Sequence, residues 1–397
     1  MRDLLEESFR AAVAAADPLR ILPAHLPPRP RGRIFVAAAG KAAASMAVAA
    51  ERHYGDAVEG IAITRYGHGL PTRGIRVVEA GHPVPDAAGE AAAREVLSRT
   101  RQLRHDDLLL ALFSGGGSSL LALPIEGLPM GGLKSLTSRL LKSGATIQEI
   151  NTVRKHLSAI QGGRLAAASR APVLALIISD VTGDDPTHIA SGPCTPDPTS
   201  IADAKAILAK YGIDFSGPFS ESPKPGDAVF ARTENKVIAT AYRSLEAAAE
   251  VFRRAGIRPV ILGDTITGEA REVGREMAQR AKETQGPAAL ISGGECTVTI
   301  KGDGGRGGRC AEFLLALGIE LAGAPNIWAI AADTDGIDGS EDNAGAVLAP
   351  DSLRRRPDAQ AMLDGHDSYG FFSGLGDLVV TGPTRTNVND YRAIVVA

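Results

Sequence analysis

The sequence has 397 residues, of which 44% are apolar and 22% charged, and this length predicts two globular domains, each with its own core. A formal net charge of −3 argues against a nucleic-acid partner, because nucleic-acid binding needs a basic surface. No apolar run reaches 18 residues, the first residues are acidic and the three cysteines form no paired motif, so we expect a cytoplasmic protein without a membrane partner.

Short apolar runs alternate with helical patterns along the first half of the chain. Strands are expected at residues 34–39, 60–64, 75–79, 108–113 and 173–178, and helices at 42–51, 86–101 and 146–165. This alternation predicts parallel strands in a doubly wound sheet. Lys41 follows the first strand, at the start of a helix, where a cation opposes the helix dipole. It therefore indicates an anionic ligand better than a solvated surface position.

The most informative feature is the loop 114–119, Ser-Gly-Gly-Gly-Ser-Ser, which directly follows the apolar run 108–113. The backbone N–H groups of such a loop can point at phosphate oxygens. Open α/β sheets also bind their ligands at the carboxyl ends of strands. A tight turn that needs glycine is the alternative, but six small residues in a row exceed what a turn requires.

The expected helix over 146–165 carries polar residues along one face, which either bind a ligand or face solvent. These residues are Asn151, Arg154, Lys155 and Ser158. After the next strand the chain supplies two candidate acids, Asp180 and Asp184, in the sequence Ser-Asp-Val-Thr-Gly-Asp-Asp.

A segment rich in proline, glycine and serine, residues 214–227, is the best candidate for a domain boundary. We expect an N-terminal domain at 1–225 and a smaller C-terminal domain at 226–397. The first should be a three-layer α/β/α sandwich with a mainly parallel, Rossmann-like sheet. The second should be an α/β domain with a mixed sheet, because residues 297–300 alternate like an edge strand.

Charged and glycine-rich loops follow the expected strands of the second half. Ser-Gly-Gly-Glu ends in Glu295, and the loop that begins at Lys301 also carries Arg306 and Arg309, whose guanidinium forks match phosphate or carboxylate. The strand at 326–333 opens into Asp-Thr-Asp-Gly-Ile-Asp-Gly, a carboxylate cluster that suits Mg²⁺, with an ordinary turn as the alternative. Phosphate-binding loops, arginines and Mg²⁺ together indicate phosphoryl transfer.

Nine motifs, in this order, resemble those of one protein family. They are Ala39–Ala42, Gly81–Asp86, Ser114–Ser119, Gly144–Ser158, Ser179–Asp185, Ile189–Pro193, Ser292–Glu295, Asp333–Gly339 and Thr381–Asp390. Over nearly its whole length the chain resembles the type-2 glycerate kinases with a C-terminal MOFRL domain, whose members are often labelled hydroxypyruvate reductases. The resemblance implies ATP- and Mg²⁺-dependent phosphorylation of D-glycerate to 2-phospho-D-glycerate, in a cleft between two α/β domains.

The resemblance also implies roles for individual residues. Lys41 matches the family's active-site lysine and Arg309 the arginine of its Gly-Gly-Arg motif, so both are expected to be catalytic, together with Asp180. Mg²⁺ is expected at Asp333 and Asp335, with Asp180 and Asp184 as the alternative pair. The expected cofactor-binding residues are Ser114, Gly115, Gly116, Gly117, Ser118, Ser119, Asn151, Lys155, Asp184, Glu295, Arg306, Glu312 and Asn387.

The chain departs from the family at Cys310 and Ala311, where the family usually has asparagine and glutamine. Cysteine and alanine have no amide side chain, so we expect no contact of that kind at these two positions. Cys194 and Cys296 likewise stand where the family more often has threonine.

Two other functions are compatible with parts of the sequence. Residues 302–307 satisfy the GxGxxG pattern of an NAD(P)H-dependent hydroxypyruvate reductase, but residues 296–301 before them alternate like a half-exposed strand. A nucleotide-sensing protein without catalysis would not need so many converging polar loops. The oligomeric state is left open, a homodimer included.

Overall fold

The computed structural model describes residues 1–300, 302 and 304–397. The chain forms two compact units, each built on a six-stranded sheet, which confirms the predicted two-domain α/β fold. The N-terminal unit comprises residues 18–238, and the C-terminal unit comprises residues 1–17 together with residues 239–397. In the described part of the chain, no helix combines the length and apolar character that a bilayer-spanning segment needs.

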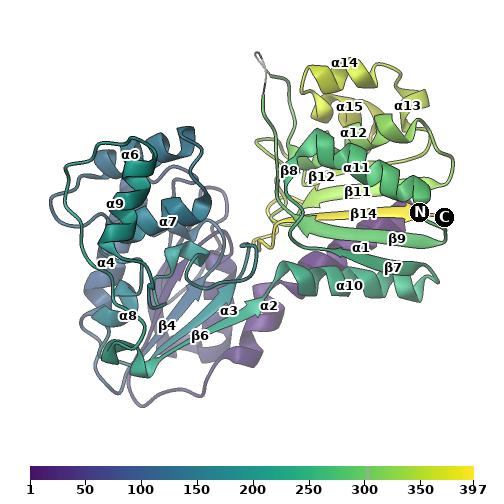
Figure 1. The fold of residues 1–397 in the computed structure, drawn as a ribbon. Helices are drawn as coiled ribbons and strands as arrows, with labels where there is room; N and C mark the ends of the chain where they lie inside the picture. Colours follow the sequence, from purple (N-terminus) through teal and green to yellow (C-terminus); the bar gives the residue numbers. More distant parts are fainter. Residues whose placement is uncertain (301, 303) are drawn as a thin grey trace. The chain divides into compact units, whose positions relative to one another are not determined.

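The sheet of the N-terminal unit has the strand order β3-β2-β1-β4-β5-β6 (Figure 1). The pairs β1–β2, β2–β3, β1–β4 and β4–β5 are parallel, as predicted. Ala39 lies beside Phe113, and Phe113 lies beside Ile177, so β1, β4 and β5 end at nearly the same level and their following loops share one edge. The strands are β1 (Ile34–Ala39), β2 (Val58–Arg65), β3 (Ile75–Ala80), β4 (Leu108–Phe113), β5 (Val173–Ile178) and β6 (Thr233–Ala239).

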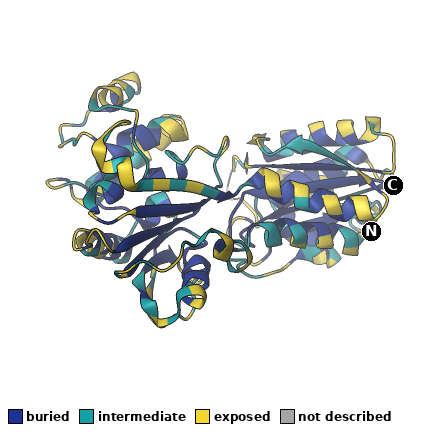
Figure 2. Cartoon of the chain, turned by 90° about the horizontal axis from the view of Figure 1, so that it is seen from below, coloured by how far each residue is buried: buried dark blue, intermediate teal, exposed yellow. Residues whose placement is uncertain are grey.

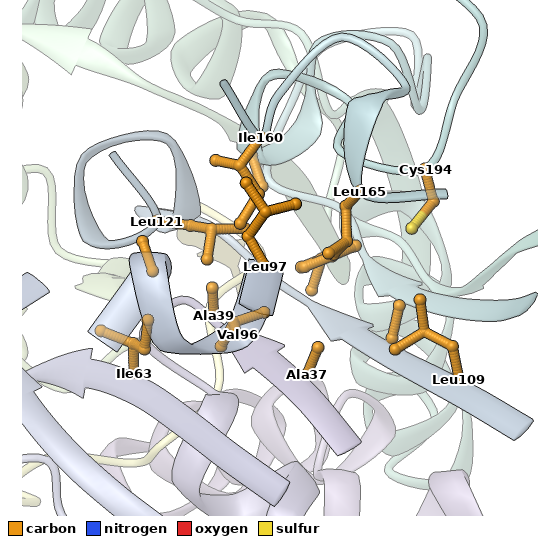
Figure 3. Packing of buried hydrophobic residues seen from close by; sticks show 14 of the residues in the cluster. Ala37, Ala39, Ile63, Val96, Leu97, Leu109, Leu121, Ile160, Leu165 and Cys194 are labelled. Carbon is orange, nitrogen blue, oxygen red and sulfur yellow. The ribbon is translucent and has the colours of Figure 1, made fainter. Parts of the chain in front are cut away.

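Helices pack on both faces of this sheet. Figure 3 shows Val96 of α4 and Leu165 of α8 packed in one cluster with Ala37 of β1 and Leu109 of β4. Helix α3 contacts β1, β2 and β4 from the opposite face, and its residues do not belong to that cluster. The helices are α2 (Pro18–Ile21), α3 (Ala43–Tyr54), α4 (Ala87–Thr100), α5 (Gly117–Leu120), α6 (Met130–Lys142), α7 (Ile147–Lys155), α8 (Arg164–Ala168) and α9 (Ile201–Lys210), with 3-10 turns at Leu22–His25, Gly55–Ala57, Ile189–Ser191 and Ala228–Arg232.

Helices α6, α7 and α9 form a smaller apolar core of their own. The helix predicted over 146–165 was too long, because α7 ends at Lys155 and α8 begins only at Arg164. Ser158 instead pairs with Pro124 in an isolated bridge. Gly162 and Gly163 then adopt φ values of 60° and 81°, which a continuing α-helix does not allow.

The sheet of the C-terminal unit has the order β13-β12-β11-β14-β9-β7. Strand β14 is antiparallel to β11 and β9, whereas β7 is parallel to β9, so the sheet is mixed as predicted. The mixed sheet was predicted because residues 297–300 alternate like an edge strand, and that reason was wrong. Strand β10 (Cys296–Thr297) instead pairs with β8 (Gly268–Glu269) in a separate two-stranded sheet. The main strands are β7 (Arg258–Gly263), β9 (Ala288–Gly294), β11 (Ile327–Asp333), β12 (Gly345–Leu348), β13 (Leu378–Val379) and β14 (Asp390–Val396).

Two helix pairs cover the faces of this second sheet. Helices α1 and α10 lie on one face, and α11 and α12 on the other (Figure 1). Along β11, Ile330 packs into the first layer and Ala329 into the second, as the alternation of a strand requires. Figure 2 shows the inner strands of this sheet buried and the outer helices striped with exposed residues. The helices are α1 (Arg2–Ala15), α10 (Ala241–Arg254), α11 (Ala270–Glu283), α12 (Arg309–Leu321), α13 (Ser352–Arg355), α14 (Ala359–Asp364) and α15 (Ser368–Leu375).

The units differ from the predicted domains 1–225 and 226–397 at two places. Residues 226–238 belong to the N-terminal unit, where β6 forms the edge of the sheet. Helix α1 belongs to the C-terminal unit, because its apolar face packs there: the rings of Phe9 and Tyr391 lie 6.0 Å apart, and the Tyr391 hydroxyl donates to Ser8 Oγ at 2.7 Å.

Candidate active site

The loops after β1 and β4 hold each other in place. The backbone N–H of Lys41 donates to the Gly115 carbonyl at 2.8 Å, and the N–H of Ala42 donates to Ser114 Oγ at 3.0 Å. Gly40 has φ of 132°, and a Cβ there would lie 2.2 Å from Ser114 Oγ. Ser114 is fully buried, so its hydroxyl shapes the loop. The structure thus joins Lys41 to the glycine–serine loop, two features that the sequence predicts separately.

Glycines let this loop approach its neighbours closely. Gly116 has φ of 80°, and a Cβ there would lie 2.9 Å from the His82 ring and 3.5 Å from Lys41 Cγ. A Cβ on Gly117 would lie 2.6 Å from the Cβ of Ala190. His82 is therefore a neighbour of the predicted site that was not among the predicted site residues, although it stands within one of the nine motifs.

A polar network continues from the end of the same loop. Ser118 Oγ lies 2.9 Å from Ser191 Oγ, and Ser191 donates to Asn151 Oδ1 at 3.2 Å. The same Asn151 oxygen accepts from Arg154 Nη1 at 2.7 Å. Ala190 and Ser191 both have positive φ, 52° and 59°, a conformation that costs roughly 1–2 kcal/mol per non-glycine residue. Such strain is common where side chains must be aimed at a ligand. Two members of this network, Ser191 and Arg154, were not among the predicted site residues.

Lys155, by contrast, points into the interior. Its side chain is 1% exposed, and Nζ lies 2.6 Å from Asp197 Oδ1. Asp197 also accepts from Ser222 Oγ at 2.8 Å. Burial would raise the pKa of Asp197, but Lys155 and the other donors lower it overall. The sequence placed Lys155 among the cofactor-binding residues, whereas the structure places its ammonium group in an internal ion pair.

Asp180 and Asp184 follow β5, the strand next to β4. Both are partly exposed, and Asp184 has φ of 54° with its N–H bonded to the Val181 carbonyl at 3.0 Å. The predicted acids therefore stand at the same edge of the sheet as the loop 114–119.

In the C-terminal unit, Arg309 at the start of α12 is held by three carboxylates. Its Nε lies 2.8 Å from Asp390, Nη2 lies 2.6 Å from Asp333 and Nη1 lies 2.9 Å from Glu295. The sheet register explains this, since Asp333 faces Asp390 and Asp390 faces Gly294, the residue before Glu295. Burial would lower the pKa of Arg309, but the three carboxylates raise it overall. Arg309 is therefore a fixed cation.

The two predicted metal ligands lie beside this arginine. Asp333 accepts the Asp335 N–H on Oδ1 at 3.0 Å, and Asp335 accepts the Ile337 N–H at 2.9 Å. No group of three metal-binding side chains occurs among the described residues. Mg²⁺ usually takes only one or two protein carboxylates and keeps several waters, and this pair of buried carboxylates fits that donor set.

Three other predicted cofactor-binding residues have protein partners. Arg306 donates from Nε to Glu341 Oε2 at 2.9 Å. Glu312 is 2% exposed and accepts from Arg271 Nη2 at 2.6 Å. Asn387 is 4% exposed, and its Oδ1 accepts the N–H of Asn389 at 3.3 Å. Lys301, the third cation of the glycine-rich loop, lies outside the described residues.

The GxGxxG string at 302–307 lacks the surroundings of a dinucleotide site. Such a site needs a strand of the main parallel sheet before the loop, but the strand before it here is β10, which belongs to the separate two-stranded sheet. Asp303 within the string lies outside the described residues. The reductase alternative therefore loses its structural context.

Comparisons with known proteins agree with this arrangement. Residues 4–220 match a family described as a domain of unknown function (DUF4147), and residues 288–390 match the MOFRL family. A glycerate 2-kinase of Pyrococcus horikoshii is 40% identical over 92% of this chain and 87% of its own length. The crystal structure of a glycerate kinase from Thermotoga maritima matches with a TM-score of 0.89 at 38% identity, covering 100% of this chain and 99% of that one. An Agrobacterium vitis protein, 51% identical over 100% of this chain and 94% of its own, bears a provisional hydroxypyruvate reductase name.

Proposed function

With its DUF4147 and MOFRL domains, this chain belongs to the glycerate kinase family, and we propose that it transfers the γ-phosphoryl group of ATP to the 2-hydroxyl of D-glycerate. The observation that carries the proposal is the Lys41–Gly115 hydrogen bond, which fixes a lysine against a glycine–serine loop at the carboxyl ends of parallel strands. Loops in that position bind phosphate oxygens through their N–H groups.

The reaction moves one group and one proton. The 2-hydroxyl oxygen of glycerate attacks the γ-phosphorus, the bond from that phosphorus to the β–γ bridging oxygen breaks, and ADP leaves. The hydroxyl proton passes to a carboxylate, a role that we assign to Asp180 because it is partly exposed at the end of β5. The products are ADP and 2-phospho-D-glycerate.

Fixed cations stabilise the charge that spreads over the equatorial oxygens of the transferred group. We assign this role to Lys41 and Arg309, the two cations that the family resemblance implies. Of the three partners of Arg309, only Glu295 has a largely exposed side chain, at 54%, against 4% for Asp333 and 0% for Asp390. An incoming phosphate oxygen therefore displaces Glu295 most readily and leaves the two buried carboxylates to hold the guanidinium group.

Mg²⁺ is part of the proposal as the partner of the nucleotide. Asp333 and Asp335 would hold it, and the ion would neutralise phosphate charge during transfer. Asp333 also forms an ion pair with Arg309, so this carboxylate would hold the metal and orient the catalytic cation.

The test is a product assay with purified protein, D-glycerate and MgATP. Enolase added alone converts 2-phosphoglycerate, but not 3-phosphoglycerate, to a product that absorbs in the ultraviolet. Immediate absorbance with enolase alone supports transfer to the 2-hydroxyl. A signal that appears only after phosphoglycerate mutase is added means transfer to the 3-hydroxyl. NADH or NADPH oxidation with hydroxypyruvate, and no ADP formed from glycerate and ATP, would replace the kinase by the reductase.

We place the reaction in the cytoplasm. Cys194, Cys296 and Cys310 are free thiols, all buried, and burial raises the pKa of all three. Free thiols are typical of a reducing compartment.

A further inference from the structure

A cavity of about 210 Å³ lies in the N-terminal unit beside the glycine–serine loop. Helix α6 lines it with Leu133 and Leu141, and the segment after β3 lines it with Val84 and two flanking prolines. Ser118, Ser119 and Arg154 complete the polar part of the wall, and Lys134 adds a second cation. The cavity is therefore apolar over one part of its wall and cationic over another.

The apolar part is unusually exposed. Val84 and Leu141 are each 60% exposed, among the highest values for large apolar side chains in the described residues. An exposed apolar patch that lines a concave pocket marks a ligand-binding site more often than a free surface. A ligand that fits here has a flat or apolar portion large enough to cover both side chains.

The cationic part is a guanidinium group with spare donors. Arg154 Nη1 donates to Asn151 Oδ1 at 2.7 Å and to Ser191 Oγ at 3.4 Å. Within the described ranges 1–300, 302 and 304–397, Arg154 forms no ion pair with a carboxylate. Burial lowers the pKa of Arg154 to about 10, so the group stays cationic near neutral pH. An arginine placed in this way is suited to a phosphate or carboxylate.

The polar network places this cation next to the proposed phosphate loop. Ser191 Oγ contacts both Arg154 and Ser118 Oγ, and Ser118 is the fifth residue of the loop 114–119. A ligand spanning the cavity would thus have an anionic portion near the loop and an apolar portion over Val84 and Leu141. D-glycerate has the anionic portion alone, whereas a purine nucleotide has both.

We propose that this cavity is the nucleobase subsite, with the purine ring against Val84 and Leu141 and Arg154 on the phosphate chain. The inference rests on the proposed kinase function and adds where the nucleotide lies. It also assigns nucleotide binding to Arg154 in place of its helical neighbour Lys155, whose ammonium group forms an ion pair with Asp197.

The test compares the double variant Val84→Ser/Leu141→Ser with wild type. Both side chains are largely exposed, so their removal should leave the fold intact. ADP binding is measured by isothermal titration calorimetry, together with KM for ATP and for D-glycerate. We expect the Kd for ADP and the KM for ATP to rise about tenfold or more, because the lost apolar contact is worth about 1.4 kcal/mol or more, while KM for D-glycerate changes less than twofold.

The matched control is Ile147→Ser on α7. Ile147 is 53% exposed but does not line the cavity, so this variant should bind ADP like wild type. Arg154→Ala should weaken the binding of inorganic tripolyphosphate, which Val84→Ser/Leu141→Ser should leave unchanged.

Two results would overturn the subsite. One is an unchanged Kd for ADP in the double variant, and the other is a rise in KM for D-glycerate alone, which would assign the cavity to the acceptor. Failure of the kinase proposal would give another result. Wild type would bind ADP, and the double variant would bind it more weakly, but wild type would form no phosphoglycerate.

Discussion

Arg309 and Asp333 form an ion pair in which Nη2 lies 2.6 Å from Oδ2. The sequence predicts separate roles for the two residues, a phosphate-binding cation and a metal ligand. Because each holds the other, a substitution at either position affects both roles. Tests of the site therefore need variants whose effects separate them.

Replacing Arg309 by alanine should lower kcat on the order of 10³-fold, by analogy with arginine fingers in phosphoryl transfer. Arg309→Lys should restore little, because an ammonium group cannot replace the fork that reaches three carboxylates. Steady-state kinetics measures this, with the urea midpoint as a check on folding. Arg306→Ala is the control, since Arg306 is 62% exposed and should affect KM more than kcat. Wild-type kcat in Arg309→Ala would remove the residue from the mechanism.

Asp335→Asn should raise the free Mg²⁺ concentration needed for half-maximal rate. Asp333 forms the ion pair with Arg309, and Asp335→Asn leaves that pair in place, so this variant tests the metal site with little effect on the catalytic cation. The measurement is the rate at buffered Mg²⁺ concentrations, with Asp342→Asn as an acidic control. EDTA-treated wild type should be inactive and should recover with Mg²⁺. Full activity without a divalent ion would refute the metal assignment.

Gly116→Ala should reduce kcat/KM much more than it reduces stability. Its φ of 80° costs alanine roughly 1–2 kcal/mol, and the new Cβ would also lie 2.9 Å from the His82 ring. Gly144→Ala is a matched control, because Gly144 has φ of 79° and nothing lies within 4 Å of its added Cβ. The two variants should lose similar stability in thermal unfolding, and only Gly116→Ala should lose activity. Equal activities would mean that the loop does not need this close approach.

Lys155→Met should destabilise the protein by about 3–5 kcal/mol, because it leaves the buried Asp197 carboxylate without its cation. KM for ATP should stay near the wild-type value. Urea unfolding and kinetics measure the two effects, and Lys155→Met/Asp197→Asn should recover part of the stability. Unchanged stability with a raised KM for ATP would instead support the nucleotide-binding role predicted from the sequence.

The contribution of the buried Asp338 carboxyl group to the free energy of unfolding should fall as pH rises toward neutrality. Burial raises the pKa of Asp338 to about 7, although the N–H groups of Ala311 and Cys310 oppose the rise. Because the folded-state pKa lies above the unfolded one, the native state holds the proton more tightly. The stabilisation that Asp338 provides in this way is complete below about pH 4 and is lost as pH rises through about 7.

Urea unfolding at pH 5 and pH 8 tests this. From pH 5 to about 7, the Asp338 contribution to the free energy of unfolding should fall by about 1.4 kcal/mol per pH unit. Asp338→Asn should lack that part of the pH dependence, whereas Asp106→Asn, at an exposed position, should retain it. Identical pH profiles in wild type and Asp338→Asn would contradict the prediction.

Much of the fold could be predicted because buried strands have a local signature. The run 108–113 is apolar throughout, and the structure buries every residue of β4. Glycine and serine after such a run identify a loop at the carboxyl end of a strand, and the register of β1 and β4 then brings Lys41 to Gly115. Local periodicity was less informative at 146–165, where the bridge between Ser158 and Pro124 breaks the helix.

What the sequence by itself determined was the order of strands, helices and polar loops, and the class of chemistry that these loops support. Only the tertiary structure decided which groups are partners. The sequence around Phe9 does not show that its ring meets Tyr391, 382 positions later. Likewise, a cation in the sequence can bind a ligand or an internal carboxylate. In the folded chain Lys155 pairs with Asp197, whereas Arg154 has no carboxylate partner among the described residues, and it is the residue that we propose for the ligand. The physical reason is that apolar burial and ion pairing depend on proximity, which the folded chain sets over long distances in sequence.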